Sequence, residues 1–132
     1  WKEAVRRSAQ PLLEQDYLSE QYITQMIRNI ETMGPYIVLA QGFALPHESP
    51  DVGGRKLGMQ LIRLKHPVPF HSQFYDPVDF VCCLSTIDKD SHLKAMFHLM
   101  NLLSKADFCE NIRKAKTAEE VYQIVYEYES IL

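Results

Sequence analysis

One apolar run in the second half of the chain constrains the fold more than any other feature. The segment VDFVCCLS, residues 78–85, is hydrophobic at nearly every position instead of alternating between apolar and polar side chains. A strand of this kind is buried on both faces, so its sheet needs a covering layer on each side. The run LGMQLIRL, residues 57–64, predicts a second covered, central strand, and shorter strands are expected at residues 36–40 and 43–45.

Helical patterns flank these strands in the sequence. Apolar residues at helical spacing predict two helices before the strands, and Gly34 followed by Pro35 predicts the end of the second helix. Helical spacing returns near Asp90, where Asp90 or Ser91 is expected to cap the helix, and TAEE at residues 117–120 matches a capping box for the last helix. We therefore predict an α/β fold with a mixed β-sheet sandwiched between helices, in three α/β/α layers.

Composition limits the classes of function. The 132 residues are 46% hydrophobic and 23% charged, which is typical of one globular domain spanning residues 1–132. The 14 basic residues are scattered and are outnumbered by 17 acidic ones, which argues against direct nucleic-acid binding. The apolar runs are too short to cross a bilayer, so we expect a cytoplasmic domain without membrane insertion. Because the first residue is Trp1, we expect a piece trimmed or excised from a longer chain.

Several familiar reactive sites do not match the sequence. Cys82 and Cys83 are adjacent within an apolar run, Cys109 stands alone, and neither arrangement is a metal-binding or redox CxxC pair. The chain has no HExxH metal motif, no GxSxG nucleophile motif and no complete phosphate loop. We expect packed, reduced thiols, no metal and no cofactor.

Histidines remain as the candidate reactive groups, namely His47, His66, His71, His92 and His98. His66 and His71 are expected in solvated loops, and His98 on the polar side of its helix. His47 follows Pro46 at the end of a short strand, where the stiffened backbone would display its imidazole. His92 falls in the first turn of a helix, where free amides favour an anion. It either occupies an exposed helix start or faces His47.

Phosphoryl transfer is the chemistry that such a pair of imidazoles would support. A neutral imidazole nitrogen can attack phosphorus and hold the group as a labile phosphoramidate. A second histidine and the amides of a helix start would stabilise the charge spread over the phosphoryl oxygens.

Four segments together resemble a known family: GPYIVLAQGFALPHESP, LKHPVPF, DPVDFVCCLSTIDKDSHLKAM and KTAEEVYQIV. They are similar to the enzyme IIA domain of the bacterial phosphotransferase system, of the mannitol–fructose type (type 2), and closest to its ascorbate-specific branch. The resemblance spans nearly the whole chain. It includes an LPH element at His47 and a DxxxH element from Asp88 to His92, in the expected order.

The resemblance implies a mechanism. His47 matches the histidine that accepts the phosphoryl group, and His92 matches the second histidine that supports it. In this family the phosphocarrier HPr is the donor and an enzyme IIB protein or domain is the acceptor. Ser49 is expected to add a hydrogen bond to the phosphoryl group. The sugar, the phosphorylated ring nitrogen and a homodimeric state are left open.

The residues that follow His47 depart from the pattern. Ascorbate-type relatives usually follow the histidine with a small residue and then arginine before proline, as in PHxRP, whereas here Glu48 and Ser49 stand in those places. An acidic side chain beside phosphohistidine would repel the phosphoryl group, and the missing arginine removes a phosphate partner. Two alternatives therefore stand beside the carrier. One is a regulatory domain at the C-terminal end of a phosphotransferase-controlled transcriptional regulator, with further regulatory domains in the same chain, and the other is a catalytically silent interaction module.

Overall fold

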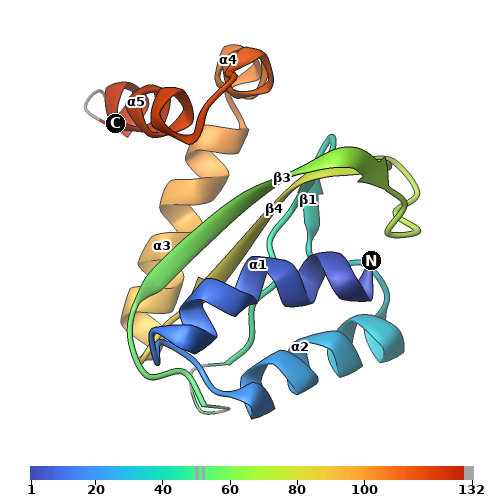
Figure 1. Cartoon of the computed structure of the whole chain (residues 1–132), viewed down its shortest axis with the longest axis vertical. Helices are drawn as coiled ribbons and strands as arrows, with labels where there is room; N and C mark the ends of the chain where they lie inside the picture. Colours follow the sequence, from blue (N-terminus) through green and yellow to red (C-terminus); the bar gives the residue numbers. More distant parts are fainter. Residues whose placement is uncertain (50, 52, 130–132) are drawn as a thin grey trace. The chain divides into compact units, whose positions relative to one another are not determined.

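The computed structural model of the chain describes residues 1–49, 51 and 53–129 (Figure 1). These residues form two compact units, Trp1–Leu93 and Lys94–Leu132, and helix α3, Lys89–Leu103, runs across the boundary between them. The expectation of a single domain over the whole chain stays a prediction.

The first unit consists of two helices followed by a mixed sheet. In the described residues the four strands have the order β1-β2-β4-β3, with β2 parallel to β4 and the other neighbours antiparallel. The predicted α/β class with a mixed sheet is confirmed. The elements are α1 (Lys2–Glu14), α2 (Glu20–Met33), β1 (Val38–Ala40), β2 (Phe43–Ala44), β3 (Gly58–Val68) and β4 (Val78–Ser85).

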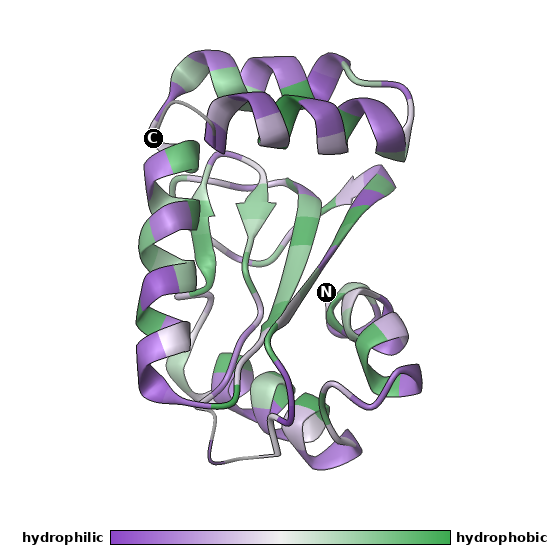
Figure 2. Ribbon diagram, turned by 90° about the vertical axis from the view of Figure 1, so that its left-hand side faces the viewer, coloured by the Kyte–Doolittle hydropathy of each residue, from purple (hydrophilic) through white to green (hydrophobic). Residues whose placement is uncertain are grey.

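Strand β4 is the centre of the sheet, as its continuous apolar run predicts. It is paired on one side with β2 and on the other with β3, and all of its residues except Asp79 are buried. Figure 2 shows hydrophobic residues concentrated on the strands, whereas the helices alternate between hydrophobic and hydrophilic surfaces. A strand paired on both edges has its backbone polar groups satisfied, so its apolar side chains can be buried without a polar cost.

Strand β3 differs from its prediction. The expectation of a covered central strand over residues 57–64 is wrong, because β3 lies at the end of the strand order and many of its residues are exposed. Met59 keeps 45% of its surface accessible although its side chain is apolar. An edge strand meets solvent along one side, and the types of its residues do not reveal on which side a neighbour is missing.

The core of the first unit lies where α1 packs against β3 and β4 and where α2 packs against α1 (Figure 1). Both helices have an apolar stripe at helical spacing, which explains why they fold as helices and which face they bury. The buried residues of these stripes are Val5, Ala9 and Leu12 from α1 and Tyr22, Ile23, Met26, Ile27 and Ile30 from α2.

Local signals set the ends of the helices. The Ser19 hydroxyl accepts a hydrogen bond from Tyr22 N at 3.3 Å and begins α2, and Gly34 ends it with a φ of 85°, as predicted. Helix α3 begins at Lys89, and the Asp88 carboxylate accepts the Ser91 N–H at 2.7 Å. Asp88 is therefore the cap rather than Asp90 or Ser91, because only a residue preceding the helix can reach the free amides of its first turn.

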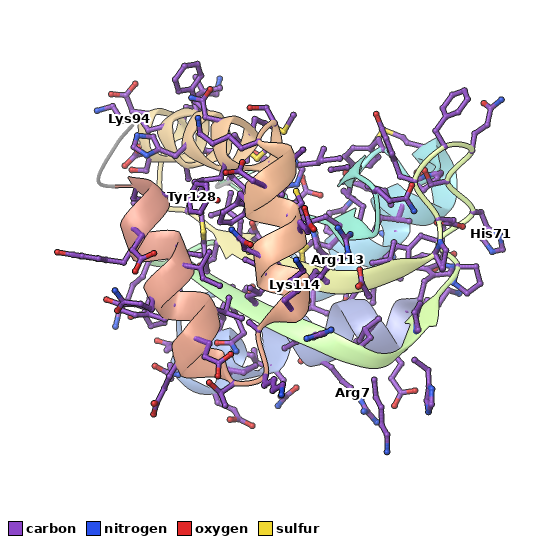
Figure 3. All side chains as sticks on the ribbon, turned by 90° about the horizontal axis from the view of Figure 1, so that it is seen from above. Arg7, His71, Lys94, Arg113, Lys114 and Tyr128 are labelled. Atoms are coloured by element: carbon purple, nitrogen blue, oxygen red, sulfur yellow. The ribbon has the colours of Figure 1, made fainter. Side chains whose placement is uncertain are left out.

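The second unit contains α4 (Ala106–Lys114) and α5 (Ala118–Glu129). The Thr117 cap of the predicted capping box is confirmed, since Thr117 Oγ1 accepts the Glu120 N–H at 3.1 Å. The Glu120 carboxylate accepts the Lys116 N–H at 2.8 Å instead of the Thr117 N–H. Tyr128 connects the two helices (Figure 3): its hydroxyl donates to Asp107 at 2.8 Å and its ring meets Phe108 edge-on. Among residues 1–49, 51 and 53–129, no helix is long and apolar enough to cross a membrane.

Two glycines give a matched test of how α2 is held. Gly53 has a φ of 102°, its carbonyl accepts the Ser19 N–H, and an added Cβ would overlap Ser19 Oγ. Gly34 has a φ of 85° with open space around it. Gly34→Ala should lose about 1 kcal/mol of unfolding free energy from backbone strain alone, and Gly53→Ala about 2 to 3 kcal/mol because the cap is also displaced. Urea unfolding followed by circular dichroism measures both, and equal losses would show that the contact with Ser19 contributes nothing.

Candidate functional site

Two histidines meet at one end of the sheet. The rings of His47 and His92 have their centroids 5.4 Å apart, with their planes inclined by 45°. Because β2 and β4 are parallel, their carboxyl ends lie at the same edge of the sheet, which is where α/β folds commonly bind ligands. His47 follows β2 and His92 follows β4. Two interpretations were left open for His92, and the structure agrees with the one in which His92 faces His47.

The backbone around His47 fixes its tautomer. His47 Nδ1 lies 2.7 Å from the carbonyl oxygen of Leu45, and a carbonyl can only accept, so Nδ1 carries the proton in this contact. The other ring nitrogen, Nε2, then keeps its lone pair. The half-buried ring meets Tyr36 edge-on at 6.1 Å, and the Leu84 N–H donates to Pro46 O at 3.0 Å, which holds the segment against β4.

His92 is held in the first turn of α3. Its N–H donates to Asp88 O at 3.1 Å, and its Nδ1 lies 3.4 Å from the hydroxyl of the buried Thr86. Partial burial is the main cause that lowers the pKa of His92 below its ordinary value of 6.5, and the charge of a protonated His47 lowers it further. Glu48 partly offsets both effects. The structure therefore favours a neutral His92 near pH 7.

Tyr22 of α2 connects the two segments that carry the histidines. Its buried hydroxyl donates to Leu84 O at 2.7 Å and accepts the Glu48 N–H at 3.0 Å. Burial raises the pKa of Tyr22, so the hydroxyl stays protonated and able to donate. This residue was not predicted from the sequence. The signal was present, because a tyrosine on an otherwise aliphatic helix face needs a partner for its hydroxyl.

The Glu48 carboxylate is held by neutral donors. Asn29 of α2 donates its side-chain amide to Glu48 Oε2, and the Ser49 N–H donates to Glu48 Oε1 at 2.7 Å. Asn29 is itself held by the amide of Gln25 at 2.9 Å. In the part of the chain that the structure describes, no lysine or arginine forms an ion pair with this carboxylate.

Ser49 lies beside the histidine pair but is exposed. Its backbone amide is bonded to Glu48, and its hydrogen bond to a phosphoryl group stays a prediction. Pro50, which completes the FALPHESP stretch, lies outside the described residues.

The other three histidines do not join the pair. His71 is exposed in a loop, as expected (Figure 3), and His98 is exposed on α3, as expected. His66 was expected in a loop but is an exposed residue of β3, which continues through Pro67 to Val68. An edge strand tolerates proline where the missing N–H would face solvent, so Pro67 did not mark the end of the strand.

The buried thiols are consistent with packing rather than chemistry. Burial raises the pKa of Cys82 to about 12 and also raises that of Cys83, which keeps both protonated and unreactive. Across the described ranges, no group of three or more histidine, cysteine or acidic residues is arranged to hold a metal ion.

The fold and the site define the chain as an α/β domain with an imidazole pair at the carboxyl ends of parallel strands. The family model described as "Phosphoenolpyruvate-dependent sugar phosphotransferase system, EIIA 2" matches residues 1–128. The chain belongs to this enzyme IIA family of phosphotransferase-system components.

Individual relatives agree with the family. The ascorbate-specific PTS system EIIA component of Salmonella choleraesuis is 31% identical over 95% of this chain and 82% of its own length. The corresponding Escherichia coli K12 component is 30% identical over the same shares. The mannitol-specific cryptic phosphotransferase enzyme IIA CmtB of Escherichia coli superposes with a TM-score of 0.86 at 34% identity, covering 95% of this chain and 84% of that one.

The proximity of the two rings predicts coupled titration. In wild type, His92 should titrate below 6.5. In His47→Gln its pKa should rise, because a repelling positive charge is gone, yet stay below 6.5 because burial remains. In Glu48→Gln it should fall further, because an attracting negative charge is gone. NMR titration of the imidazole Cε1–H signals measures all three, and identical midpoints would contradict the described electrostatics.

Proposed function

We propose that this chain is a phosphoryl carrier of the sugar phosphotransferase system, which accepts a phosphoryl group from phosphorylated HPr on His47 and passes it to an enzyme IIB partner. One observation carries the proposal: the Leu45 carbonyl holds the Nδ1 proton of His47, so Nε2 presents a lone pair beside a second imidazole. Membership of the enzyme IIA family and the ascorbate-specific relatives support the same reaction class.

In this mechanism His47 Nε2 attacks phosphorus in line with the bond to the donor's imidazole nitrogen. The new N–P bond forms as the old one breaks, and its electron pair returns to the donor ring. Positive charge develops on the His47 ring, and the Leu45 carbonyl stabilises it through the Nδ1–H contact. No proton needs to leave the site, because the donor imidazole and the His47 imidazole each keep their second ring nitrogen protonated while they carry the group.

His92 is proposed to hold the phosphoryl oxygens during transfer. A neutral His92 whose Nδ1 accepts from the Thr86 hydroxyl carries its proton on Nε2, which makes that atom a hydrogen-bond donor. Donors fixed in place before the reaction stabilise charge as it develops, at no cost in reorganisation. Helix α3 fixes the histidine, because Asp88 caps the turn that carries it.

Exposed apolar side chains that contact His47 or flank His92 in the sequence suit a protein partner. Tyr36, which meets the His47 ring, is 42% exposed, and Ile87 and Leu93 are 58% and 65% exposed. An apolar border around a reactive group is typical of a surface that excludes water when a partner docks. We propose that HPr and enzyme IIB use this border in turn. We also propose that the chain serves a transport system of the ascorbate or mannitol class. The sugar itself binds to another component of that system.

A second candidate is a regulatory enzyme IIA-like domain, in which phosphorylation of the same histidine reports sugar flux to a transcriptional regulator. Glu48 favours it, because a carboxylate beside the acceptor is a departure from the transport relatives. Transfer from the phosphorylated chain to a purified enzyme IIB separates the candidates, since the carrier must pass the group on at a useful rate.

His47 is the first residue to test. In His47→Ala, incubation with phosphoenolpyruvate, enzyme I and HPr should give no acid-labile phosphoryl group by intact-mass analysis, whereas wild type should gain one. His71→Ala, which removes an exposed loop imidazole, is the matched control and should behave as wild type. A normal level of phosphorylation in His47→Ala would refute the proposal. No gain in wild type, with reagents proven on a known acceptor, would leave the silent interaction module.

His92 should affect the rate of transfer rather than the fold. His92→Ala removes a donor to the phosphoryl oxygens, so the rate of phosphorylation by phosphorylated HPr should fall roughly tenfold to hundredfold. The thermal midpoint should change little, because the side chain is only partly buried. His98→Ala, on an exposed face of the same helix, is the control. Rapid-quench kinetics measure both variants, and a wild-type rate in His92→Ala would remove the proposed role.

A further inference from the structure

We propose that Glu48 sets the phosphoryl-transfer potential of His47: its carboxylate destabilises the phosphorylated state and so drives the group onward. The inference rests on the proposed function, because it concerns the energy of phosphorylated His47. It goes beyond that function by assigning a residue that neither accepts nor holds the group, and it predicts a shift in an equilibrium rather than a loss of activity.

The carboxylate belongs to the residue that follows the acceptor histidine, and it is held by helix α2. Glu48 follows His47 directly, so their Cα atoms are about 3.8 Å apart. Its backbone N–H is bonded to the buried Tyr22 hydroxyl, and its two carboxylate oxygens accept from Asn29 and from the Ser49 N–H. Helix α2 thus holds both the main chain and the side chain of Glu48. These hydrogen bonds favour one position of the acidic group over a solvated one.

The charge of this carboxylate is not neutralised where it is held. Its hydrogen-bond donors are a side-chain amide and a backbone amide, and neither is charged. Among the residues that the structure describes, the ion pairs found lie elsewhere, such as Lys2 with Glu31 on the surface of the first unit. The half-buried position limits screening by solvent, so the negative charge acts on its neighbours.

Two groups on either side of His47 respond to this charge. Glu48 contributes to the raised pKa of the Tyr36 phenol, after burial as the main cause. It also raises the pKa of His92 against the opposing effects of burial and His47. Tyr36 and His92 both contact the His47 ring, so the charge of Glu48 acts on the groups next to that ring.

The sign of the effect follows from the charges. A phosphoryl group carries about −1.5 to −2 charges near pH 7. Unphosphorylated His47 carries no negative charge, so the carboxylate raises the energy of the phosphorylated state relative to the free state. In the exchange of phosphorylated HPr and free chain for free HPr and phosphorylated chain, one N–P bond forms as another breaks. Repulsion from Glu48 therefore shifts this exchange toward phosphorylated HPr and toward any acceptor that follows.

The equilibrium constant of that exchange is the measurement to make, because a docking role cannot change it. A residue that only contacts the partner alters the forward and reverse rates equally. Purified phosphorylated HPr, freed of enzyme I, is mixed with the chain, and intact mass gives the ratio of the four species at equilibrium. Glu48→Gln removes the charge and keeps the size and one acceptor oxygen. Glu48→Asp keeps the charge, and Glu31→Gln removes an exposed carboxylate from α2.

Glu48→Gln should shift the equilibrium toward the phosphorylated chain by roughly three- to tenfold, as expected for one partly screened charge. Glu48→Asp and Glu31→Gln should stay within about twofold of wild type. An unchanged ratio in Glu48→Gln overturns the inference, and so does an equal shift in all three variants.

Failure of the inference and failure of the proposed function give different results. If wild type accepts nothing and Glu48→Gln accepts the group on His47, the carboxylate acts in the inferred direction, and the carrier function fails for the natural chain. If neither protein accepts the group, both the carrier function and the role of Glu48 are refuted. If both accept it with the same equilibrium constant, the carrier function stands and the role of Glu48 is refuted.

Discussion

The parallel pairing of β2 with β4 is the interaction on which the site depends. Two residue pairs, Phe43 with Phe80 and Ala44 with Val81, set the register so that both strands end at the same edge of the sheet. His47 and His92 are 45 positions apart in the sequence, yet their rings come into contact there. A strand of only two residues can fix this geometry because its neighbour β4 is buried and paired on both sides. The buried sheet therefore positions the two histidines.

The sequence revealed those features whose cause is local. The apolar run of β4, the glycine stop at Gly34 and the Thr117 cap each depend on residues close by in the sequence, and each is confirmed. The predicted central position of β3 and the predicted cap of α3 were wrong. Strand order is a long-range property, and a cap depends on where the first helical turn begins. The contact between His47 and His92 was only one of two interpretations, because it depends on the parallel register of β2 and β4, which no residue pattern shows.

Helix α2 has a larger part in the site than its sequence suggested. Its apolar stripe predicts a core helix, and it is one, but Tyr22 and Asn29 extend from the same element to the main chain and side chain of Glu48. One lies on the buried face and the other beside it, so neither disturbs the amphipathic pattern. Sequence periodicity reports which face is buried and leaves out which polar atoms on that face have distant partners.

A carrier differs from an ordinary enzyme in what its site must favour. A site that binds the phosphoryl group too well becomes a trap, because the stabilised intermediate no longer passes the group on. In the proposed site, a donor such as His92 would lower the barrier to transfer in both directions. A fixed negative charge beside the acceptor raises the energy of the loaded state alone. The combination of His92 with Glu48 would thus keep the barrier low and the intermediate from accumulating, which is what a relay between two proteins requires.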